Sequence, residues 1–428
     1  MKTFINPKRN EWKSILKRPT KTVDDIEATV LDVFKDVKRN GDNAIKSYTK
    51  KFDRVVLENQ IVSEKEVIEA SNNVANELKE AIQLAKSNIE VFHKAQITDR
   101  IELTTMDGVA CWQEKRPIQK VGLYIPGGTA PLFSTVLMLA IPANIAGCKE
   151  IVLCSPPNKD GKIANEILYA AQLCGVTKIV KVGGIQAVAG LTFGTESIPQ
   201  VYKIFGPGNQ YVTVAKQLAT KYGVAIDMPA GPSELLVMAD ESANAAYVAS
   251  DLLSQAEHGS DSQVILVTTS EVFANKVNTE VYKQLDILPR KAIATDAINN
   301  SKSIVVNNFE TALDLIDKYG PEHFIVTTNN DGYFVENIGN AGSVFIGNYT
   351  PESAGDYASG TNHTLPTNGF SKAYSGVNLD SFQKSMTFQK ISAKGITNIG
   401  PAIELMAEAE GLQAHKNAVT LRLKDLKS

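Results

Sequence analysis

The sequence has few cysteines and histidines and no excess of basic charge. Its 428 residues include four cysteines, Cys111, Cys148, Cys154 and Cys174, and these form no C-x-x-C pair. Their spacing excludes a cysteine-based zinc ribbon and suits a reducing compartment. The formal net charge of -3 and the pI near 6.1 leave no basic face, which argues against nucleic acid as a partner.

Long apolar segments are also absent. The longest apolar run, from Val136 to Ala146, is interrupted by Pro142 and Asn144, and no apolar stretch follows the charged N-terminal residues. We therefore expect a cytoplasmic protein without a secretory leader or a membrane span. Hydrophobic residues make up 43% of the chain, which is enough for the cores of two or more domains at this length.

The dinucleotide fingerprint G-x-G-x-x-G is missing from the turns where it would be expected. Pro126-Gly127-Gly128 and Gly206-Pro207-Gly208 each follow a strand-like segment and precede a helix-like one, a context in which backbone N-H groups bind phosphate. An anionic cofactor and a plain tight turn both fit this pattern. Cys154 also follows a strand-like segment, where a thiol could attack an aldehyde, although a packed cysteine is the alternative.

What the sequence does contain is an alternation of strand, turn and helix that occurs twice. The first set of predicted strands covers residues 121–125, 151–154, 178–182, 202–205 and 224–227. The second set covers residues 235–238, 263–268, 304–306, 324–326 and 343–346. This alternation predicts an α/β protein with two Rossmann-like parallel-sheet domains and right-handed crossovers.

The two ends of the chain have a different pattern. The first hundred residues are predominantly helical in pattern, and we expect them to pack on the second block because they hold too few strands for a sheet of their own. Asp107-Gly108 between two strand-like segments predicts a β-hairpin. Beyond Val377 the alternation stops, and a strand at 386–391 followed by a helix broken at Gly411 is typical of a dimerisation arm.

Two pairs of polar residues are candidates for chemistry. Gln255 and His258 are three residues apart at the end of a predicted helix, so they could present two donor atoms to a metal ion, or simply form a solvated helix end. Glu322 and His323 begin a predicted strand. They could activate water and accept a proton, or form an exposed pair at a loop end. His93, near the end of a helix, has no converging partner and is interpreted as structural.

Three further candidates lie where the pattern is irregular. Asp356 and His363 occupy a long loop, and His415 follows the break at Gly411. Together with Gln255 and His258, Asp356 and His415 would supply two nitrogens and two oxygens, a set compatible with zinc, manganese or cobalt. Spacing alone does not bring these residues together, so the residues themselves support a metal-assisted α/β enzyme and nothing more specific.

Eight stretches in chain order resemble the histidinol dehydrogenase family. They are VGLYIPGGTAPLFSTVLMLAIPA, KVGGIQAVAG, FGPGNQYV, DMPAGPSELLV, DLLSQAEHGSDSQ, YGPEHF, AGDYASGTNHTLPT and EAEGLQAHKNA. The resemblance implies a zinc-dependent enzyme that oxidises L-histidinol to L-histidine through L-histidinaldehyde and reduces two NAD+ for each substrate. It also implies one zinc ion per subunit in a homodimer whose C-terminal arm reaches the partner's site.

The resemblance also assigns roles to individual residues. His323 is expected to be the general base, and Glu322 is expected to activate the water that hydrates the aldehyde. The implied zinc ligands are Gln255, His258, Asp356 and His415. Further contacts to substrate are implied for Ser233, His363 and Glu410, in addition to the zinc ligands and His323. The implied NAD contacts are Tyr124, Gln186 and Asn209.

Four segments are expected from these observations together. They are an N-terminal helical segment, 1–22, that packs with the C-terminal arm; a larger α/β domain, 23–120 with 234–377, that carries the metal and catalytic residues; a Rossmann-like domain, 121–233, that contributes NAD contacts; and a dimerisation arm, 378–428. Two other functions remain open at this point. One is a metal-dependent hydrolase in which Glu322 activates water, and the other is a two-lobed protein that binds a small molecule without chemistry.

Overall fold

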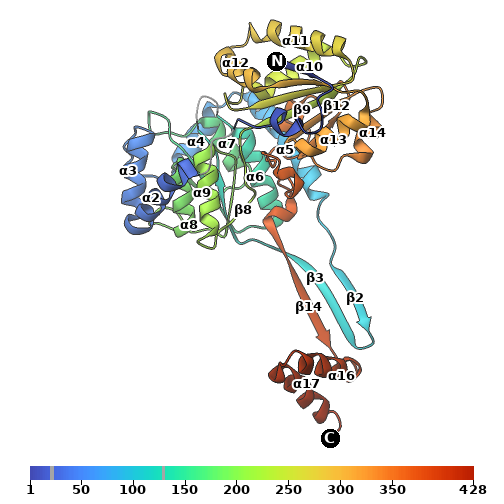
Figure 1. Cartoon of the computed structure of the whole chain (residues 1–428). Helices are drawn as coiled ribbons and strands as arrows, with labels where there is room; N and C mark the ends of the chain where they lie inside the picture. The colour runs from blue at the N-terminus through green and yellow to red at the C-terminus, as the bar shows by residue number, and fades with distance from the viewer. Residues whose placement is uncertain (20–23, 128–130) are drawn as a thin grey trace. The chain divides into compact units, whose positions relative to one another are not determined.

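The computed structural model describes residues 1–19, 24–127 and 131–428 (Figure 1). The described chain divides into two compact units. The first unit comprises Met1–Gln96 and Ile118–Phe382, and the second comprises Ile97–Pro117 and Gln383–Ser428. Among the described residues, no helix combines the length and the apolar content that a membrane crossing requires.

One parallel sheet of the first unit has five strands in the order β6-β5-β4-β7-β8. The strands are β4 Lys120–Tyr124, β5 Glu150–Ser155, β6 Lys178–Lys181, β7 Lys203–Phe205 and β8 Ala225–Ile226. The helices that connect them are α6 Phe133–Ala146, α7 Asn165–Leu173, α8 Gly184–Phe193 and α9 Gln210–Thr220. The first predicted set of strands is therefore confirmed. Strands β4, β5, β6 and β7 are largely buried on both faces, as near-continuous apolar runs in a covered parallel sheet should be, whereas the short edge strand β8 is partly exposed.

The other parallel sheet has six strands in the order β1-β11-β10-β9-β12-β13. They are β1 Lys2–Ile5, β9 Glu234–Ala239, β10 Gln263–Thr268, β11 Lys302–Val305, β12 His323–Thr327 and β13 Ser343–Ile346. The second predicted set is confirmed, and two parallel sheets make the expected α/β fold. The edge strand β1, which pairs with β11, was not predicted, because a four-residue segment at a chain end is too short to show a period.

Residues of β9 alternate between two hydrophobic cores. Leu235 and Val237 face one core, and Leu236 and Met238 face the other. The first core is covered by α10 Ala245–Ala256, α11 Glu271–Leu285 and α12 Lys291–Asn300. The second is covered by α1 Trp12–Ile15, α13 Phe309–Tyr319 and α14 Asp331–Asn337. The sheet is thus a central layer between helices.

The helices near the N-terminus pack on the five-stranded sheet's helices, which corrects the expected packing on the second block. These helices are α2 Asp24–Asn40, α3 Asp42–Phe52, α4 Glu64–Asn73 and α5 Asn76–Lys94. Helix α2 packs on α8 and α9, α4 on α7, and α5 on α6. The reason is the apolar stripe of α2, in which Val30 and Phe34 join the core that holds Val188 and Leu191. The first residues, in contrast, contribute β1 and α1 to the six-stranded side.

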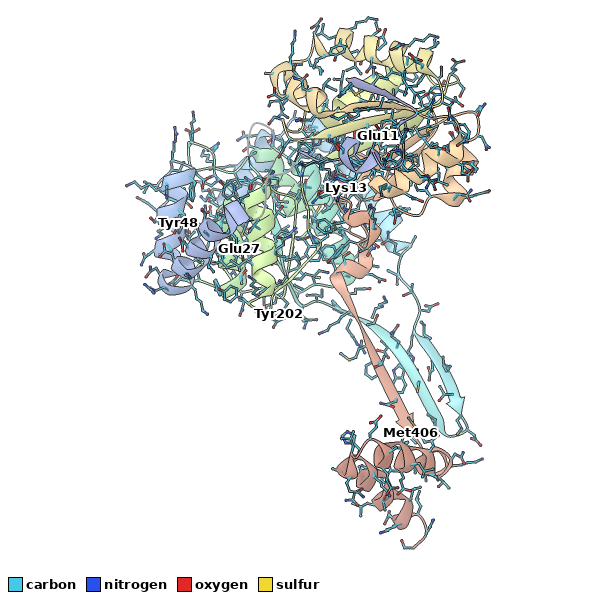
Figure 2. The ribbon with its side chains drawn as sticks, viewed as in Figure 1. Glu11, Lys13, Glu27, Tyr48, Tyr202 and Met406 are labelled. Carbon is cyan, nitrogen blue, oxygen red and sulfur yellow. The ribbon has the colours of Figure 1, made fainter. Side chains whose placement is uncertain are left out.

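The second unit is a three-stranded antiparallel sheet with two helices. The sheet has the order β14-β3-β2, with β2 Ile101–Met106, β3 Val109–Pro117 and β14 Gln383–Ile391. The hairpin predicted at Asp107-Gly108 is confirmed, and Gly108 has the positive φ of +84° that such a turn requires. Helices α16 Ala393–Ala409 and α17 Gln413–Asp425 follow, separated at Gly411 as predicted. Met406 is exposed on α16 (Figure 2).

Candidate active site

Polar side chains of the first unit gather at the amino ends of β9 and β12, which are neighbours in the six-stranded sheet. His323, the first residue of β12, pairs with Leu235 of β9, so Ser233 and Glu234 lie beside Glu322 and His323. Open parallel sheets usually place ligands at the carboxyl ends of their strands. The polar cluster in this sheet lies at the opposite ends, where strands β9 and β12 begin.

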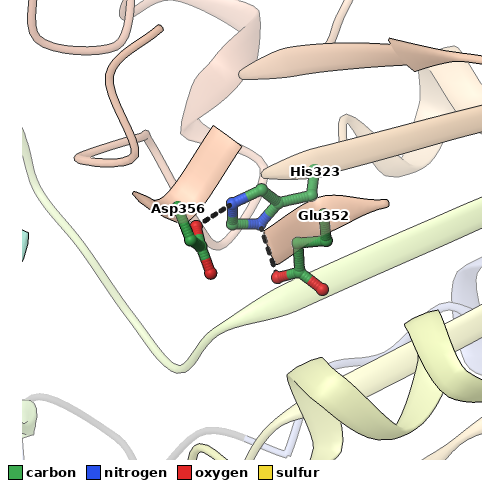
Figure 3. Close-up of side chains that lie close together, drawn as sticks. All are labelled: His323, Glu352 and Asp356. Atoms are coloured by element: carbon green, nitrogen blue, oxygen red, sulfur yellow. Dashed lines mark ion pairs between the residues drawn. The ribbon is translucent and has the colours of Figure 1, made fainter. Parts of the chain in front are cut away.

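His323 lies between two carboxylates (Figure 3). Its Nδ1 atom is 3.6 Å from Glu352 Oε1 and its Nε2 atom is 3.7 Å from Asp356 Oδ1. Glu352 and Asp356 belong to α15, Glu352–Tyr357, and one ligand atom from each of the three residues lies within 4.8 Å of the others. His323 and Glu352 are buried, so the group forms an enclosed set of nitrogen and oxygen donors that could hold a cation.

Glu322 and His323 converge although they are adjacent in sequence. Glu322 precedes the strand, and its Oε2 atom accepts a hydrogen bond of 2.8 Å from the backbone N-H of Glu234 and lies 3.7 Å from His323 Nδ1. The Nδ1 atom of His323 is in turn 3.2 Å from the carbonyl oxygen of Glu234. The turn into β12 re-aims Glu322, because on a regular strand the two side chains would point to opposite faces.

Burial and mutual charge shift the pKa values of these groups. Burial raises the pKa of Glu322 to about 8 and that of Glu352 to about 8. Burial lowers the pKa of His323, but the carboxylates of Glu322, Glu352 and Asp356 outweigh it and raise the value to about 10. Burial opposes ionisation of Asp356 too, yet its close attraction to the His323 imidazole lowers its pKa. Since three carboxylates surround one imidazole, a cation among them would lower the pKa of His323.

Gln255 reaches the cluster from the last turn of α10, so it does not form a solvated helix end. With the amide oriented to satisfy both neighbours, its nitrogen donates to Glu352 and its oxygen accepts from the backbone N-H of Glu234 at 3.1 Å. His258 follows the end of the helix. Desolvation lowers the pKa of His258 and the Asp356 carboxylate opposes this, so the two side chains share one electrostatic environment.

His363 is held beside the cluster by two hydrogen bonds. Its Nδ1-H donates to the carbonyl oxygen of Asp356 at 2.9 Å, and its Nε2 atom is 3.2 Å from the hydroxyl of Thr135 on α6. The neighbouring Asn362 amide lies 3.4 Å from Nε2 of the fully buried His93. His93 therefore has a converging polar partner, which the sequence did not reveal, and it supports the loop that carries His363.

Glu410 and His415 belong to the second unit. Glu410 follows the last residue of α16, His415 lies on α17, and both are exposed there. Of the four residues expected to bind zinc, Gln255, His258 and Asp356 are in the first unit and His415 is in the second.

Two acidic residues of the cluster were not found by sequence reasoning. Glu352 is four residues before Asp356, which places both on one face of a helix, and this spacing was the available signal. Glu234 directly follows Ser233, but nothing in the sequence indicated that its backbone would contact Glu322 and His323, because that depends on the strand order.

The imidazole, carboxylate and amide groups of the cluster are suitable ligands for zinc or a metal ion with similar preferences. Among the described residues, Nε2 of His323 is a buried side-chain nitrogen without a hydrogen-bond partner. Imidazole, carboxylate and amide groups lie around it, and these are ligand types that zinc, manganese and cobalt accept.

A separate cavity of about 850 Å³ opens at the carboxyl ends of the five-stranded sheet. Tyr124, Gln186 and Asn209 line it together with Asp53. Tyr124 ends β4 and Asn209 follows β7, so the cavity lies where the strand order reverses, the usual place for a nucleotide in such sheets. Tyr124 accepts a 3.1 Å hydrogen bond from the N-H of Gly184, while the Oε1 atom of buried Gln186 has no partner among the described groups.

The sequence also singled out Pro126-Gly127-Gly128 and Cys154. Gly128, the last residue of Pro126-Gly127-Gly128, lies outside the described residues. Cys154 is completely buried in the core, and burial raises the pKa of its thiol well above the usual range. A thiol in that position is a packed hydrophobic group and a poor nucleophile.

The chain is similar along its whole length to proteins of one family. A family model described as histidinol dehydrogenase matches residues 16–423. A histidinol dehydrogenase of Bacteroides fragilis is 58% identical over 427 residues, which cover 100% of both chains. One from Escherichia coli is 52% identical over 420 residues, 97% of this chain and 96% of the relative. The crystal structure of histidinol dehydrogenase from Elizabethkingia anophelis superimposes with a TM-score of 0.97 at 56% identity, covering 100% of this chain and 99% of the other.

Proposed function

The chain belongs to the histidinol dehydrogenase family and is an NAD-dependent oxidoreductase of histidine biosynthesis, and we propose that it oxidises L-histidinol to L-histidine through L-histidinaldehyde with two NAD+ consumed. The observation that carries the mechanism is the buried imidazole of His323 in contact with Glu322, Glu352 and Asp356. Family membership implies zinc and NAD as cofactors.

Zinc is assigned to Gln255, His258 and Asp356 of one chain and to His415 of the partner subunit, with one ion in each subunit. When bound, zinc supplies a positively charged anchor for the imidazole and amino nitrogens of the substrate, which acts mainly by orienting the carbon that loses hydride. The convergence of Gln255 and Asp356 on one buried donor set supports the assignment.

His323 is the proposed general base for the first oxidation. Its Nδ1-H donates to the carbonyl oxygen of Glu234, which leaves the Nε2 lone pair free. In the first step the substrate's hydroxyl proton moves to Nε2, the C-H bond gives hydride to NAD+, and L-histidinaldehyde forms. General-base catalysis of this kind contributes roughly 10²- to 10⁴-fold to the rate.

Glu322 is the proposed base for the second oxidation. It takes a proton from water as the water oxygen attacks the aldehyde carbon, and this gives the oxyanion of the hydrate. The oxyanion then loses hydride to a second NAD+ and its remaining hydroxyl proton to the site, which yields the carboxylate of L-histidine. The hydrogen bond from Glu234 N-H fixes the carboxylate for this task.

The remaining assigned residues bind the two ligands. Ser233, His363 and Glu410 are assigned to substrate. NAD is assigned to Tyr124, Gln186 and Asn209, and their position on one cavity at the strand-order reversal supports this. In this proposal residues 121–233 form the domain that contributes NAD contacts, and residues 234–377 carry the metal and catalytic groups.

We infer that the active form is a homodimer with shared sites. The second unit exposes several large apolar side chains, which an isolated chain would leave in water. They are Ile101, Leu103, Leu405, Met406 and Leu421. A partner subunit that covers them would also carry its His415 and Glu410 toward the first unit.

The decisive experiment counts NADH. With limiting L-histidinol and excess NAD+, two NADH per substrate are expected, and one NADH per substrate would contradict the double oxidation. Removal of metal by a chelator should abolish turnover, and added zinc should restore it. A metal-dependent hydrolase that uses Glu322 would form no NADH from this substrate, and a protein that only binds it would show no turnover.

A further inference from the structure

Arg18 and Glu234 form an ion pair, and the backbone of Glu234 contacts Glu322 and His323. The Arg18 guanidinium contacts both carboxylate oxygens, through Nε to Oε1 and through Nη2 to Oε2 at 2.9 Å. The Arg18 and Glu234 side chains are 15% and 2% exposed. A bidentate contact between a guanidinium and a carboxylate fixes the relative orientation of the two groups as well as the distance between them. Neither residue belongs to the sets assigned to zinc, substrate or NAD.

Arg18 also holds the turn that leads into Glu322. Its Nη2 atom donates to the carbonyl oxygen of Tyr319 at 2.9 Å and of Gly320 at 3.4 Å, and its guanidinium lies 4.0 Å from the centre of the Tyr319 ring. These carbonyls end helix α13 just before Glu322. One side chain near the N-terminus therefore ties the start of β9 to the turn before β12.

The backbone of Glu234 contacts three residues of the site. Its N-H donates to Glu322 Oε2 at 2.8 Å and faces the amide oxygen of Gln255 at 3.1 Å. Its carbonyl oxygen is 3.2 Å from His323 Nδ1 and selects the tautomer that keeps Nε2 free. The position of this single peptide segment thus sets the placement of the water-activating carboxylate and of the base.

The side chain of Glu234 needs a counter-charge to remain where it is. Its carboxylate is buried, and apart from Arg18 its Oε1 atom accepts a 2.8 Å hydrogen bond from the backbone N-H of Asn368. A buried carboxylate that loses its cation must take up a proton or move toward water. Either response shifts the first peptide groups of β9.

We propose that Arg18 is a positioning residue for the reaction, which acts through Glu234 to hold Glu322 and His323 in the geometry for proton transfer. The inference rests on the roles proposed above for Glu322 and His323. Arg18 is not among the residues assigned to substrate or NAD and does not line the cavity assigned to NAD, so its loss should lower kcat and leave the KM for NAD unchanged. An error of about 1 Å at reacting groups costs on the order of 10²-fold in rate.

The test compares Arg18→Met, Arg18→Lys and Arg9→Met with the wild-type homodimer. Arg9 is the matched control, because it lies in the same N-terminal segment and pairs with Asp314 at the surface, where the two side chains are 73% and 41% exposed. For each protein, kcat per bound zinc, KM for NAD and the melting temperature are measured. We expect Arg18→Met to lose roughly 10- to 100-fold in kcat. Arg18→Lys should lie between Arg18→Met and the wild type, and Arg9→Met should match the wild type.

The outcomes separate positioning from simple stabilisation. If Arg18→Met melts at a lower temperature but keeps the wild-type kcat per zinc, the inference is wrong. If Arg18→Met does not fold, Arg18→Lys provides the test, since lysine keeps the positive charge but cannot make the bidentate contact with Glu234. A wild-type kcat in Arg18→Lys then overturns the proposal. A wild-type protein that forms no NADH from L-histidinol refutes the proposed function itself. NADH formation with equal kcat in Arg18→Met and Arg9→Met refutes this inference alone.

Discussion

At the scale of single residues, Glu322 and His323 are proposed to have different tasks, and the two half-reactions can separate them. Glu322→Gln keeps an oxygen that can accept the hydrogen bond from Glu234 N-H but removes the base for water. We expect oxidation of L-histidinaldehyde to slow by roughly 10²- to 10⁴-fold and oxidation of L-histidinol to slow far less, because only the second step needs a hydrate.

The measurement is NADH formation from L-histidinaldehyde, set against NADH formation from L-histidinol with the aldehyde chemically trapped. Both rates come from one preparation, so the alcohol step is an internal control for folding and zinc content. Equal losses in the two half-reactions would contradict the role assigned to Glu322.

Asp53 lines the cavity assigned to NAD, and its buried carboxylate is expected to lower the stability of the fold. Its Oδ2 atom is buried without a hydrogen-bond partner among the described groups, and desolvation raises its pKa from 3.8 to about 6. An acid with a raised pKa in the folded state destabilises the fold as pH rises from about 4 to about 6, and the cost persists at higher pH. We expect Asp53→Asn to melt at a higher temperature than the wild type at pH 7.5, with the gain vanishing below pH 4.

Thermal unfolding across this pH range tests the assignment. The exposed Asp99 provides the control, since Asp99→Asn should leave the melting curve unchanged. A gain for Asp53→Asn that is equal at pH 4 and pH 7.5 would contradict an electrostatic origin. A weaker affinity of the variant for NAD would show what the buried carboxylate contributes in return.

At the scale of elements, continuous apolar runs made the sheets predictable and left the packing of the N-terminal helices undetermined. Continuous apolar runs such as the one in β5 are buried on both faces, and this pattern is typical of strands in a parallel sheet. The stripe on α2 shows only that the helix has an apolar side, and it does not say which sheet that side covers. For the same reason, spacing along the chain could offer Gln255 and His258 as a candidate pair at a helix end, and it could not offer Glu234.

The loop that carries Asn209 is closed by a buried ion pair. Lys216 on α9 contacts Asp227 and donates to the carbonyl oxygen of Gly206 at 2.8 Å, while Asp227 accepts from the N-H of Gly206 at 2.8 Å. Their side chains are 4% and 1% exposed. Lys216→Met should lower the free energy of unfolding by about 3–5 kcal/mol, because it leaves a buried carboxylate unpaired.

Urea unfolding measures the effect, and two further variants interpret it. Lys216→Met combined with Asp227→Asn should lose less than Lys216→Met alone, since the uncompensated charge is gone. Lys221→Met removes a pair with Glu27 at the surface near the end of α9, and it should change stability by less than about 1 kcal/mol. If the double variant is the least stable of the three, the loop is held by packing rather than by charge.

At the scale of the whole molecule, the two parallel sheets share one strand order, but their candidate sites lie at opposite ends of the strands. The order β6-β5-β4-β7-β8 is matched by β11-β10-β9-β12-β13, so each sheet reverses its strand order beside its first core strand. The cavity assigned to NAD lies at the carboxyl ends of one sheet, whereas the catalytic cluster lies at the amino ends of the other. The alternation of strand, turn and helix in the sequence predicts both sheets. Because the alternation is the same in the two sheets, it does not indicate at which strand ends the functional residues lie. Zinc, substrate and NAD residues therefore depended on motif resemblance, and the domain boundaries stay a prediction.

A site shared between subunits makes a prediction that a site within one chain does not. Chains with Glu322→Gln and chains with His415→Ala should each form almost no L-histidine from L-histidinol as homodimers. In a mixed dimer, the first unit of the His415→Ala chain receives the intact His415 of the partner subunit, so one of its two sites is complete. Random exchange of equal amounts should therefore restore about a quarter of the wild-type activity. If both mutations are placed in one chain and mixed with wild type, a mixed dimer should have no complete site, because one first unit lacks Glu322 and the other receives no intact His415 of the partner subunit. Activity that stays at the level of the separate variants, after subunit exchange is verified with tagged chains, would place His415 outside the partner's site.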